Sequence, residues 1–322
     1  MITPLKILEI NNRKEKQHKV ISYSQLSMFL KCPHSWKLKY IDRIKFDSIS
    51  IHLPFGNAFH ETMQEYVESY LNDTIEQAND VNFENIIPDK LYKEYERFVI
   101  KNKNEHFSNP SELTEFSYDG IYIMNWIKKH ISDYIHKSTH HFIGTEVPIY
   151  YKLQNNLYFN GYIDQLLGFK NQNDLLLWDY KTSTRGWGPW QKKDKIATLQ
   201  MVLYKYFILK ELGLDIRKNE KFIKPQYFIV RRKLIDDSEF LQKRVQIFEP
   251  SNGIVTLNKA KKYLDHFVHT AFKEDSKEYN LEYNYPAITG VSQNNCKFCK
   301  LKDNDNLCPK HLRKTAEIIK TK

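Results

Sequence analysis

The sequence predicts an α/β protein in which helices cover the faces of a central sheet, preceded by a mainly helical section. Two observations lead to this prediction. Three consecutive apolar, aromatic and β-branched segments, separated by polar turns, lie within residues 142–182 and are typical of strands. Apolar residues recur at helical spacing before and after them. A block of strands between helical stretches favours a sheet packed against helices.

Four segments are expected along the 322 residues, which are enough for one large domain or two of ordinary size. Residues 1–20 form a basic polar arm, and residues 21–140 form the mainly helical section. Residues 141–275 form the core of sheet and helices. Residues 276–322 form a C-terminal segment that contains three of the four cysteines.

The helical section begins with two short helices over residues 22–40. Cys32 lies at their joint, because Pro33 cannot continue a helix. A long amphipathic helix is predicted over residues 55–71 and carries His60 near its start. Further helices are predicted around residues 90–103 and 118–137.

The core begins with the three strands, at residues 142–153, 157–169 and 174–182, which predict a meander. A helix follows at residues 195–212. Two more strands are predicted at residues 225–233 and 243–250, and a last helix at residues 258–273.

The charge balance makes a polyanion the first partner to consider. The chain has 49 Lys and Arg against 39 Asp and Glu, a formal net charge of +10. A lysine-rich soluble protein without such a partner is the alternative. No apolar run approaches the roughly 18 residues of a membrane span, and the polar start lacks the apolar core of a signal peptide. We therefore expect an intracellular, cytoplasmic protein that does not contact membranes, in which clustered cysteines bind metal rather than form disulfides.

Acidic residues in two neighbouring strands are the candidate reactive groups. In "LLLWDYK", strand alternation places Asp179 and Lys181 on one side of the sheet, about 7 Å apart. Asp164 occupies a similar apolar setting one strand earlier. Two carboxylates from adjacent strands can converge on divalent ions and, with a lysine, support phosphodiester hydrolysis. The alternative is that both acids cap strands or pair with lysines.

Four motifs in order carry a resemblance to a known family. They are "GNAFH" (residues 56–60), "GYID" (161–164), "DYK" (179–181) and "QMVLY" (200–204). The chain resembles the PD-(D/E)XK nuclease superfamily. Within it, the chain is similar to the RecB-like branch, which includes the iron-sulfur nucleases of bacterial recombination helicase-nucleases and of CRISPR adaptation.

The resemblance implies a restriction-endonuclease-like fold and a role for each motif residue. His60, Asp164 and Asp179 would bind Mg²⁺ or Mn²⁺, with the Tyr180 carbonyl as a fourth contributor. Lys181 would be the catalytic lysine. Gln200 and Tyr204 would support substrate binding or the surroundings of the lysine. Glu146 is a further candidate near the metals, and an exposed strand end would explain it equally well.

The cysteines match the same branch. Cys296, Cys299 and Cys308 follow the C-x-x-C pattern with a third thiol, and Cys32 lies far upstream. The resemblance implies a four-iron, four-sulfur cluster that clasps the C-terminus to the N-terminal helices. Zinc is the alternative, because four thiols suit either metal.

Two basic stretches are candidates for contact with nucleic acid. Arg185, Trp187 and Trp190 lie in a loop that could stack on unpaired bases, or whose tryptophans could pack onto the body as a lid. The "RRK" at residues 231–233 either lines a phosphate track or is a solvated strand end.

Together these observations predict a metal-dependent DNA nuclease, expected to be an exonuclease. Its substrate would be single-stranded DNA or DNA with free ends. Its role would lie in DNA recombination, repair, replication or processing, alongside a helicase or recombination partner. The alternatives are a catalytically inactive or a zinc-stabilised nucleic-acid-binding protein.

Overall fold

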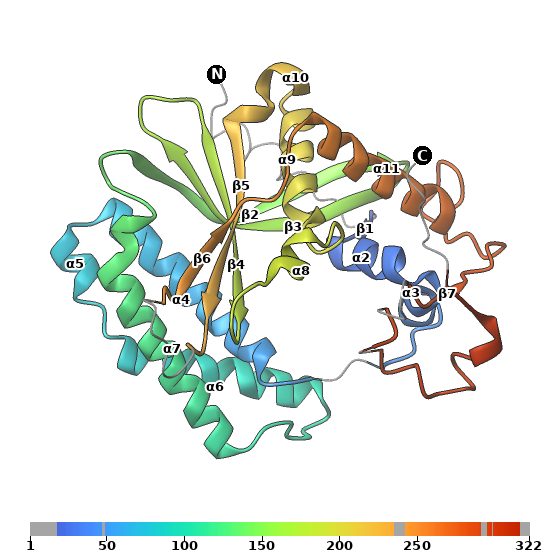
Figure 1. Ribbon diagram of the computed structural model, residues 1–322, viewed down its shortest axis with the longest axis horizontal. Helices are drawn as coiled ribbons and strands as arrows, with labels where there is room; N and C mark the ends of the chain where they lie inside the picture. Colours follow the sequence, from blue (N-terminus) through green and yellow to red (C-terminus); the bar gives the residue numbers. More distant parts are fainter. Residues whose placement is uncertain (1–17, 47–48, 235–241, 291–294, 298, 316–322) are drawn as a thin grey trace.

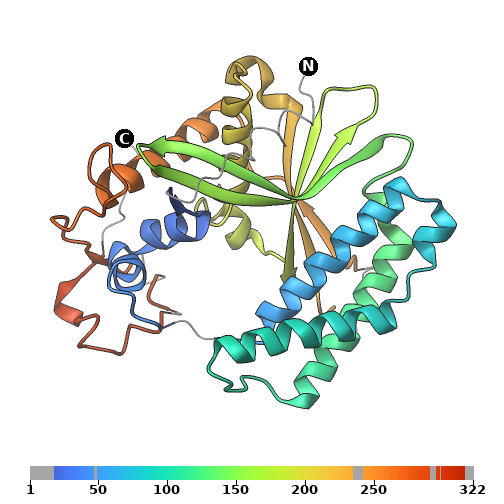
Figure 2. The same ribbon diagram turned by 180° about the vertical axis from the view of Figure 1, so that it is seen from behind.

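A six-stranded mixed sheet forms the centre of the computed structural model, and helices cover both of its faces (Figures 1 and 2). The structure describes residues 18–46, 49–234, 242–290, 295–297 and 299–315. The predicted α/β class with a mixed sheet flanked by helices is confirmed.

The predicted meander is present at the centre of this sheet. The strands are β1 (Lys19–Ile21), β2 (His140–Gln154), β3 (Leu157–Phe169), β4 (Leu175–Ser183), β5 (Ile223–Arg231) and β6 (Val245–Phe248). β2, β3 and β4 pair antiparallel in succession, β4 pairs parallel with β5, and β6 pairs antiparallel with β5. β1 pairs parallel with the start of β3, so Lys19 and Val20, which the sequence assigned to the basic arm, belong to the sheet.

Alternate residues of β4 face two separate hydrophobic cores. Leu175 and Leu177 enter the first core, whereas Leu176, Trp178 and Tyr180 enter the second. This is the two-residue period of a strand that is buried on both faces. Asp179 and Lys181 therefore belong to the first face.

The helices of the section 21–140 divide between the two faces. α2 (Tyr23–Lys31) and α3 (Pro33–Tyr40) join α9 (Leu199–Glu211) and α11 (Ile254–Ala271) in the first core. α4 (His52–Asn72), α6 (Phe83–Lys101) and α7 (Pro110–His130) form the second core, with the short α5 (Ile75–Asn79) beside them. Figure 1 shows these two groups on opposite sides of the strands.

Several predicted helix boundaries are wrong because polar caps lie outside the apolar pattern. α6 begins at Phe83 rather than near residue 90, since the Asn82 side chain accepts a hydrogen bond from the Glu84 N–H. α7 begins at Pro110 rather than near residue 118, with Asn109 as its cap, and ends at His130. The helix predicted over residues 195–212 begins at Leu199, and a separate short α8 (Pro189–Lys193) precedes it.

The joint predicted at Cys32 is confirmed. Cys32 is extended, ends α2 and precedes α3, whose first residue is Pro33. The C-terminal segment packs against this joint: the Ile288 N–H donates to Cys32 Sγ (3.5 Å), and the Asn295 amide donates to the Lys31 carbonyl (2.6 Å). The small strands β7 (Ala287–Ile288) and β8 (Arg313–Lys314) pair within this segment, and α10 (Ile216–Asn219) precedes β5.

Among the helices that the structure describes, none is both long enough and apolar enough to span a membrane.

Candidate active site

β3 and β4 separate at the predicted reactive groups. The two strands pair only over Gln165–Gly168 and Leu175–Trp178. Asp164 and Asp179 are the first residues beyond this paired stretch, so they lie opposite each other where the strands diverge. Backbone groups of β4 that lose their neighbour at this point need other partners.

The Asp164 carboxylate supplies one such partner. Its Oδ2 accepts a hydrogen bond from the Tyr180 N–H at 2.7 Å, and it lies 3.3 Å from His60 Nδ1. The Gln64 side chain donates to the Asp164 carbonyl at 3.0 Å. The acid is thus held between β4 and α4, and His60 reaches it from the helix on which the sequence placed this histidine.

Asp179 is buried, with 1% of its surface exposed. Its Oδ2 forms an ion pair with Lys181 Nζ, as strand alternation predicted for two residues on one face. Among the described residues, this oxygen makes no hydrogen bond of normal geometry. The Lys181 side chain keeps 32% of its surface exposed, so its charged end is held by Asp179 while its flank faces solvent.

The protonation states follow from burial and from this charge arrangement. Burial, assisted by the Lys181 charge, lowers the pKa of His60 to about 4, which leaves a neutral imidazole at neutral pH. Burial raises the pKa of Asp164 and the pKa of Asp179 to about 6, against the opposing effect of Lys181. Burial also acts to lower the pKa of Lys181, but the two carboxylates outweigh it and the net pKa is raised.

The donor types at this site suit a hard divalent cation. A neutral imidazole and two carboxylates are available, and one of their oxygens, Asp179 Oδ2, is buried and contacts Lys181. Within the ranges that the structure describes, no three His, Cys, Asp or Glu side chains are gathered as a metal site. Tyr180 contributes its N–H to Asp164, and the role of its carbonyl stays a prediction.

Gln200 and Tyr204 lie against the strand that carries Asp164. The Gln200 amide donates to the Tyr204 hydroxyl at 3.2 Å. A Cβ atom on Gly161 would lie 2.6 Å from that hydroxyl oxygen, so a larger residue would collide with it. Burial, and after it the charges of Asp179 and Asp164, raise the pKa of Tyr204. The glycine of "GYID" thus makes room for the tyrosine of "QMVLY".

Glu146 is linked to Asp164 by Gln64, a residue that the sequence did not single out. The Gln64 amide that holds the Asp164 carbonyl also donates to Glu146 Oε1 at 2.8 Å, and the Glu146 charge contributes to the raised pKa of Asp164. Glu146 is exposed and has a φ of 46°, a conformation rare for residues other than glycine. The available signal for Gln64 was its position four residues after His60, on the same face of the helix.

The three candidate residues in the loop after β4 differ in their exposure: Trp187 is packed, whereas Trp190 and Arg185 are exposed. The Trp187 N–H donates to Gln246 Oε1 at 2.9 Å, and its ring lies 4.8 Å from the Tyr227 ring, against the first core. Trp190 is 68% exposed, and Arg185 is also exposed.

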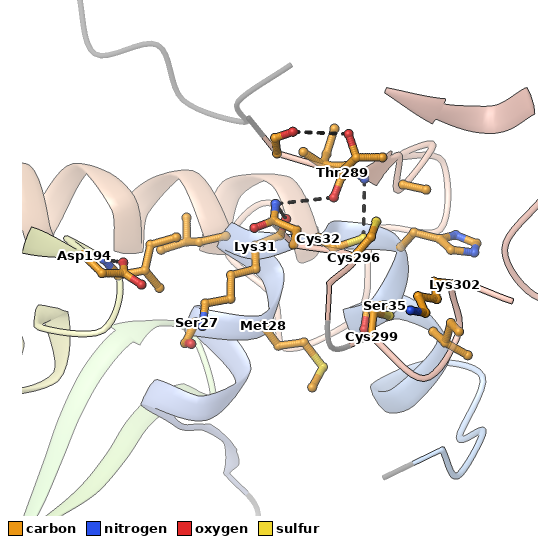
Figure 3. A pocket seen from close by; sticks show the side chains of 18 of the residues that line it. Ser27, Met28, Lys31, Cys32, Ser35, Asp194, Thr289, Cys296, Cys299 and Lys302 are labelled. Carbon is orange, nitrogen blue, oxygen red and sulfur yellow. Dashed lines mark hydrogen bonds between the residues drawn. The ribbon is translucent and has the colours of Figure 1, made fainter. Parts of the chain in front are cut away.

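The four cysteines line one pocket of about 1010 Å³ between the α2–α3 joint and the C-terminal segment. Figure 3 shows Cys32, Cys296 and Cys299 around this pocket, with Asp194 at its other end. Burial and the neighbouring Cys308 and Cys299 thiols raise the pKa of Cys32, and burial with the Cys299 and Cys308 thiols raises the pKa of Cys296. The four thiols thus share one pocket, although within the described residues no three of them are gathered as a metal site.

A second residue missed from the sequence connects this pocket with the acids. Tyr23 lines the pocket, and its hydroxyl donates to the Ile196 carbonyl at 2.7 Å. Burial, and to a lesser degree the Asp179 charge, raise the pKa of this tyrosine. The cysteine pocket therefore has a wall that lies near the candidate active site.

Comparison with known proteins supplies the family. No curated protein matches the chain significantly. Among solved structures, a "Putative exonuclease" from Eubacterium rectale is 13% identical, with a TM-score of 0.42, over 80% of each chain. The protein SSO0001 is 12% identical, with a TM-score of 0.29, over 81% of this chain and 82% of its own. The model of the PD-(D/E)XK nuclease superfamily matches residues 20–304, which include all four motifs, and the chain therefore belongs to this superfamily.

Proposed function

We propose that this chain is a metal-dependent deoxyribonuclease that hydrolyses phosphodiester bonds. The observation that carries the proposal is a pair of contacts where β3 and β4 separate: His60 Nδ1 lies 3.3 Å from Asp164 Oδ2, and Lys181 forms an ion pair with Asp179. Membership in a nuclease superfamily supports the same reaction class.

In this proposal His60, Asp164 and Asp179, with the Tyr180 carbonyl, hold Mg²⁺ or Mn²⁺. When bound, the ion polarises a phosphoryl oxygen and lowers the pKa of water. Lys181, kept charged by Asp179, orients the attacking water or stabilises the charge that develops on the phosphate. Gln200 and Tyr204 keep the Asp164 strand in place through the contact at Gly161.

We further propose that the enzyme is an exonuclease of the RecB-like branch acting on single-stranded DNA or on free ends. The motif order supports this branch, and the exposed ring of Trp190 is available for stacking on an unpaired base. Exposed Arg185 is available to contact phosphate. A helicase or recombination partner would supply the opened strand, in recombination, repair, replication or processing of DNA.

We also propose that Cys32, Cys296, Cys299 and Cys308 hold a four-iron, four-sulfur cluster. Their shared pocket and the raised pKa values of Cys32 and Cys296, to which the other two thiols contribute, support a common ligand. Zinc is the alternative occupant. Anaerobically purified protein with broad visible absorbance and about four irons per chain would favour the cluster. A colourless protein with stoichiometric zinc would contradict it.

Cleavage of end-labelled linear DNA and closed circular DNA, each single- and double-stranded, tests the activity. Mg²⁺ or Mn²⁺ should support cleavage, EDTA should abolish it, and Asp179→Ala and Lys181→Ala should be inactive while folded. Activity on linear DNA alone would support an exonuclease. Full activity of either variant would contradict the assigned site. Binding without any metal-dependent cleavage would favour the catalytically inactive or zinc-stabilised nucleic-acid-binding protein.

A further inference from the structure

The three consecutive cations at the end of β5 have different environments. Arg232 pairs with Glu115 (3.0 Å) and Asp119 (2.5 Å) of α7, and Lys233 pairs with both acids at 2.9 Å. Arg231 differs: among the described residues, no acid pairs with its guanidinium, although its Nε, like that of Arg232, is buried without a hydrogen bond. Two of the three cations are therefore neutralised by acids of α7, whereas Arg231 has no such acid among the described residues.

Arg231 lies on the face of the sheet that carries the catalytic acids. β4 and β5 pair in parallel, with Asp179 opposite Tyr227 and Ser183 opposite Arg231. Because side chains alternate along a strand, Asp179, Lys181, Ser183 and Arg231 share one face. Strand geometry places the Arg231 backbone roughly 8 Å from that of Lys181. An arginine side chain spans much of this distance.

The turn after β4 fixes the position of this guanidinium. Gly186 has a φ of 87°, and a Cβ atom at this position would lie 2.9 Å from Arg231 Nε, so the turn lies directly on the arginine. The Ser183 hydroxyl donates to the Gly186 carbonyl and accepts from its N–H, both at 3.1 Å. The next residue, Trp187, forms two hydrogen bonds with the Gln246 side chain: its N–H donates to Gln246 Oε1, and its carbonyl accepts from Gln246 Nε2.

A guanidinium without a paired acid keeps its full positive charge, whereas Glu115 and Asp119 offset the charges of Arg232 and Lys233. An arginine fixed in this way is suited to an anion that arrives from solution. Guanidinium groups bind phosphate through two parallel hydrogen bonds, and the phosphates are the anionic groups of a DNA strand.

We propose that Arg231 binds a non-scissile phosphate of the cleaved DNA strand, next to the phosphate attacked at Asp164 and Asp179. This inference rests on the proposed nuclease function and makes Arg231 a positioning residue. Its contact sets the register of the strand, so that one phosphodiester at a time lies over the acids.

Binding of a fluorescent single-stranded oligonucleotide in EDTA tests the inference without cleavage. Arg231→Gln should weaken binding about tenfold, and Arg231→Lys less, because lysine keeps the charge but not the paired hydrogen bonds. The slope of log Kd against log salt should fall by about 0.7 for Arg231→Gln, the value for one lost phosphate contact to a single strand. Lys233→Gln is the matched control: it removes the same charge two residues away, and its binding should stay within about twofold because Glu115 and Asp119 already neutralise it.

A scan with single neutral methylphosphonate linkages then locates the phosphate. One linkage should weaken binding by wild type about tenfold and leave Arg231→Gln unaffected, a coupling that a purely structural role would not produce. If Arg231→Gln is poorly folded, Arg231→Lys provides the same coupling measurement. Equal sensitivity of wild type and variant to every linkage would overturn the inference. If one linkage shows this coupling but the protein never cleaves DNA, the phosphate contact of Arg231 is supported and the proposed nuclease function is rejected.

Discussion

Asp164 Oδ2 and the Tyr180 backbone N–H are joined by a 2.7 Å hydrogen bond across the point where β3 and β4 separate. The Asp164 carboxylate thus completes the edge of β4 by accepting the Tyr180 N–H where β3 no longer pairs with it, and it also faces His60. The hydrogen bond and the proposed catalytic role therefore belong to one side chain, and different substitutions should separate them.

Asp164→Asn should retain the fold and lose cleavage. The amide oxygen of asparagine can still accept the Tyr180 N–H, but the neutral group binds a divalent cation poorly. Asp164→Ala should lose cleavage and should also be about 1–3 kcal/mol less stable than Asp164→Asn, because the Tyr180 N–H is left without a partner. Urea unfolding of both variants, with a cleavage assay, measures the difference. Equal stability of the two variants would show that the hydrogen bond contributes little.

The stability of metal-free protein should depend on pH through the same residue. The folded pKa of Asp164 is about 6, above its ordinary value of 3.8, so the folded state binds more protons than the unfolded state in this interval. Its contribution to stability is therefore fully present below pH 4 and is lost as the pH rises through 6.

Asp164→Asn, which does not titrate, is the reference for this pH dependence. Relative to that variant, wild type should lose up to about 3 kcal/mol between pH 4 and pH 7. Unfolding in EDTA across this range measures the loss. At pH 7, Mg²⁺ should restore the stability of wild type but should not stabilise Asp164→Asn, because the ion binds preferentially to folded wild type. A constant difference across the pH range would contradict the raised pKa.

The two motif glycines should respond oppositely to alanine. Gly161→Ala should destabilise the protein by about 1–3 kcal/mol, since its Cβ would lie 2.6 Å from the Tyr204 hydroxyl oxygen. Tyr204→Phe should recover part of this loss by removing that oxygen.

Gly56→Ala is the matched control for the Gly161 prediction. Its Cβ would meet only Thr182 Oγ1 at an ordinary 3.7 Å, and alanine favours the helix, so it should stabilise the protein by roughly 0.5–1 kcal/mol. Thermal and urea unfolding of the four proteins provide the comparison. Similar losses at both glycines would indicate a general cost of altering the motifs rather than the Tyr204 contact.

Cys308→Ala should lower thermal stability and DNA processing together, without changing the chemistry at Asp164 and Asp179. A ligand shared with Cys32 closes a very long loop, and its loss releases both the C-terminal segment and the α2–α3 joint. The melting temperature under anaerobic conditions should fall by several degrees, and cleavage should fall with it.

Chelator-treated wild type separates the ligand role of Cys308 from its packing role. The side chain also packs with Leu38 and Leu301. If the thiol acts as a ligand, wild type and variant should melt alike once the metal is removed. Unchanged melting and unchanged activity in the untreated variant would show that the thiol is dispensable.

Local patterns predicted the parts of this protein that depend on near neighbours in sequence. The central meander, the joint at Cys32 and the shared face of Asp179 and Lys181 follow from turn residues, from the geometry of proline and from strand alternation. The starts of α6 and α7 were missed because their caps, Asn82 and Asn109, lie outside the apolar pattern. β1 was missed because it is three residues long and gains its stability from pairing with β3.

The candidate site was predicted only as an ordered set of motifs. The sequence contains no sign that Gln64 joins Glu146 to Asp164, that Tyr204 rests on Gly161, or that Glu115 and Asp119 pair with Arg232 and Lys233. Each of these contacts joins residues far apart in the chain.

The sequence by itself thus determined the α/β class, the order of the strands along the chain and the chemical types available at the site. Only the tertiary structure decided how the first helices divide between the two faces, which acid completes the open edge of β4 and which cations after β5 pair with the acids of α7. Periodicity and capping are encoded over a few residues. Partner choice between distant segments depends instead on burial and on where the paired strands diverge.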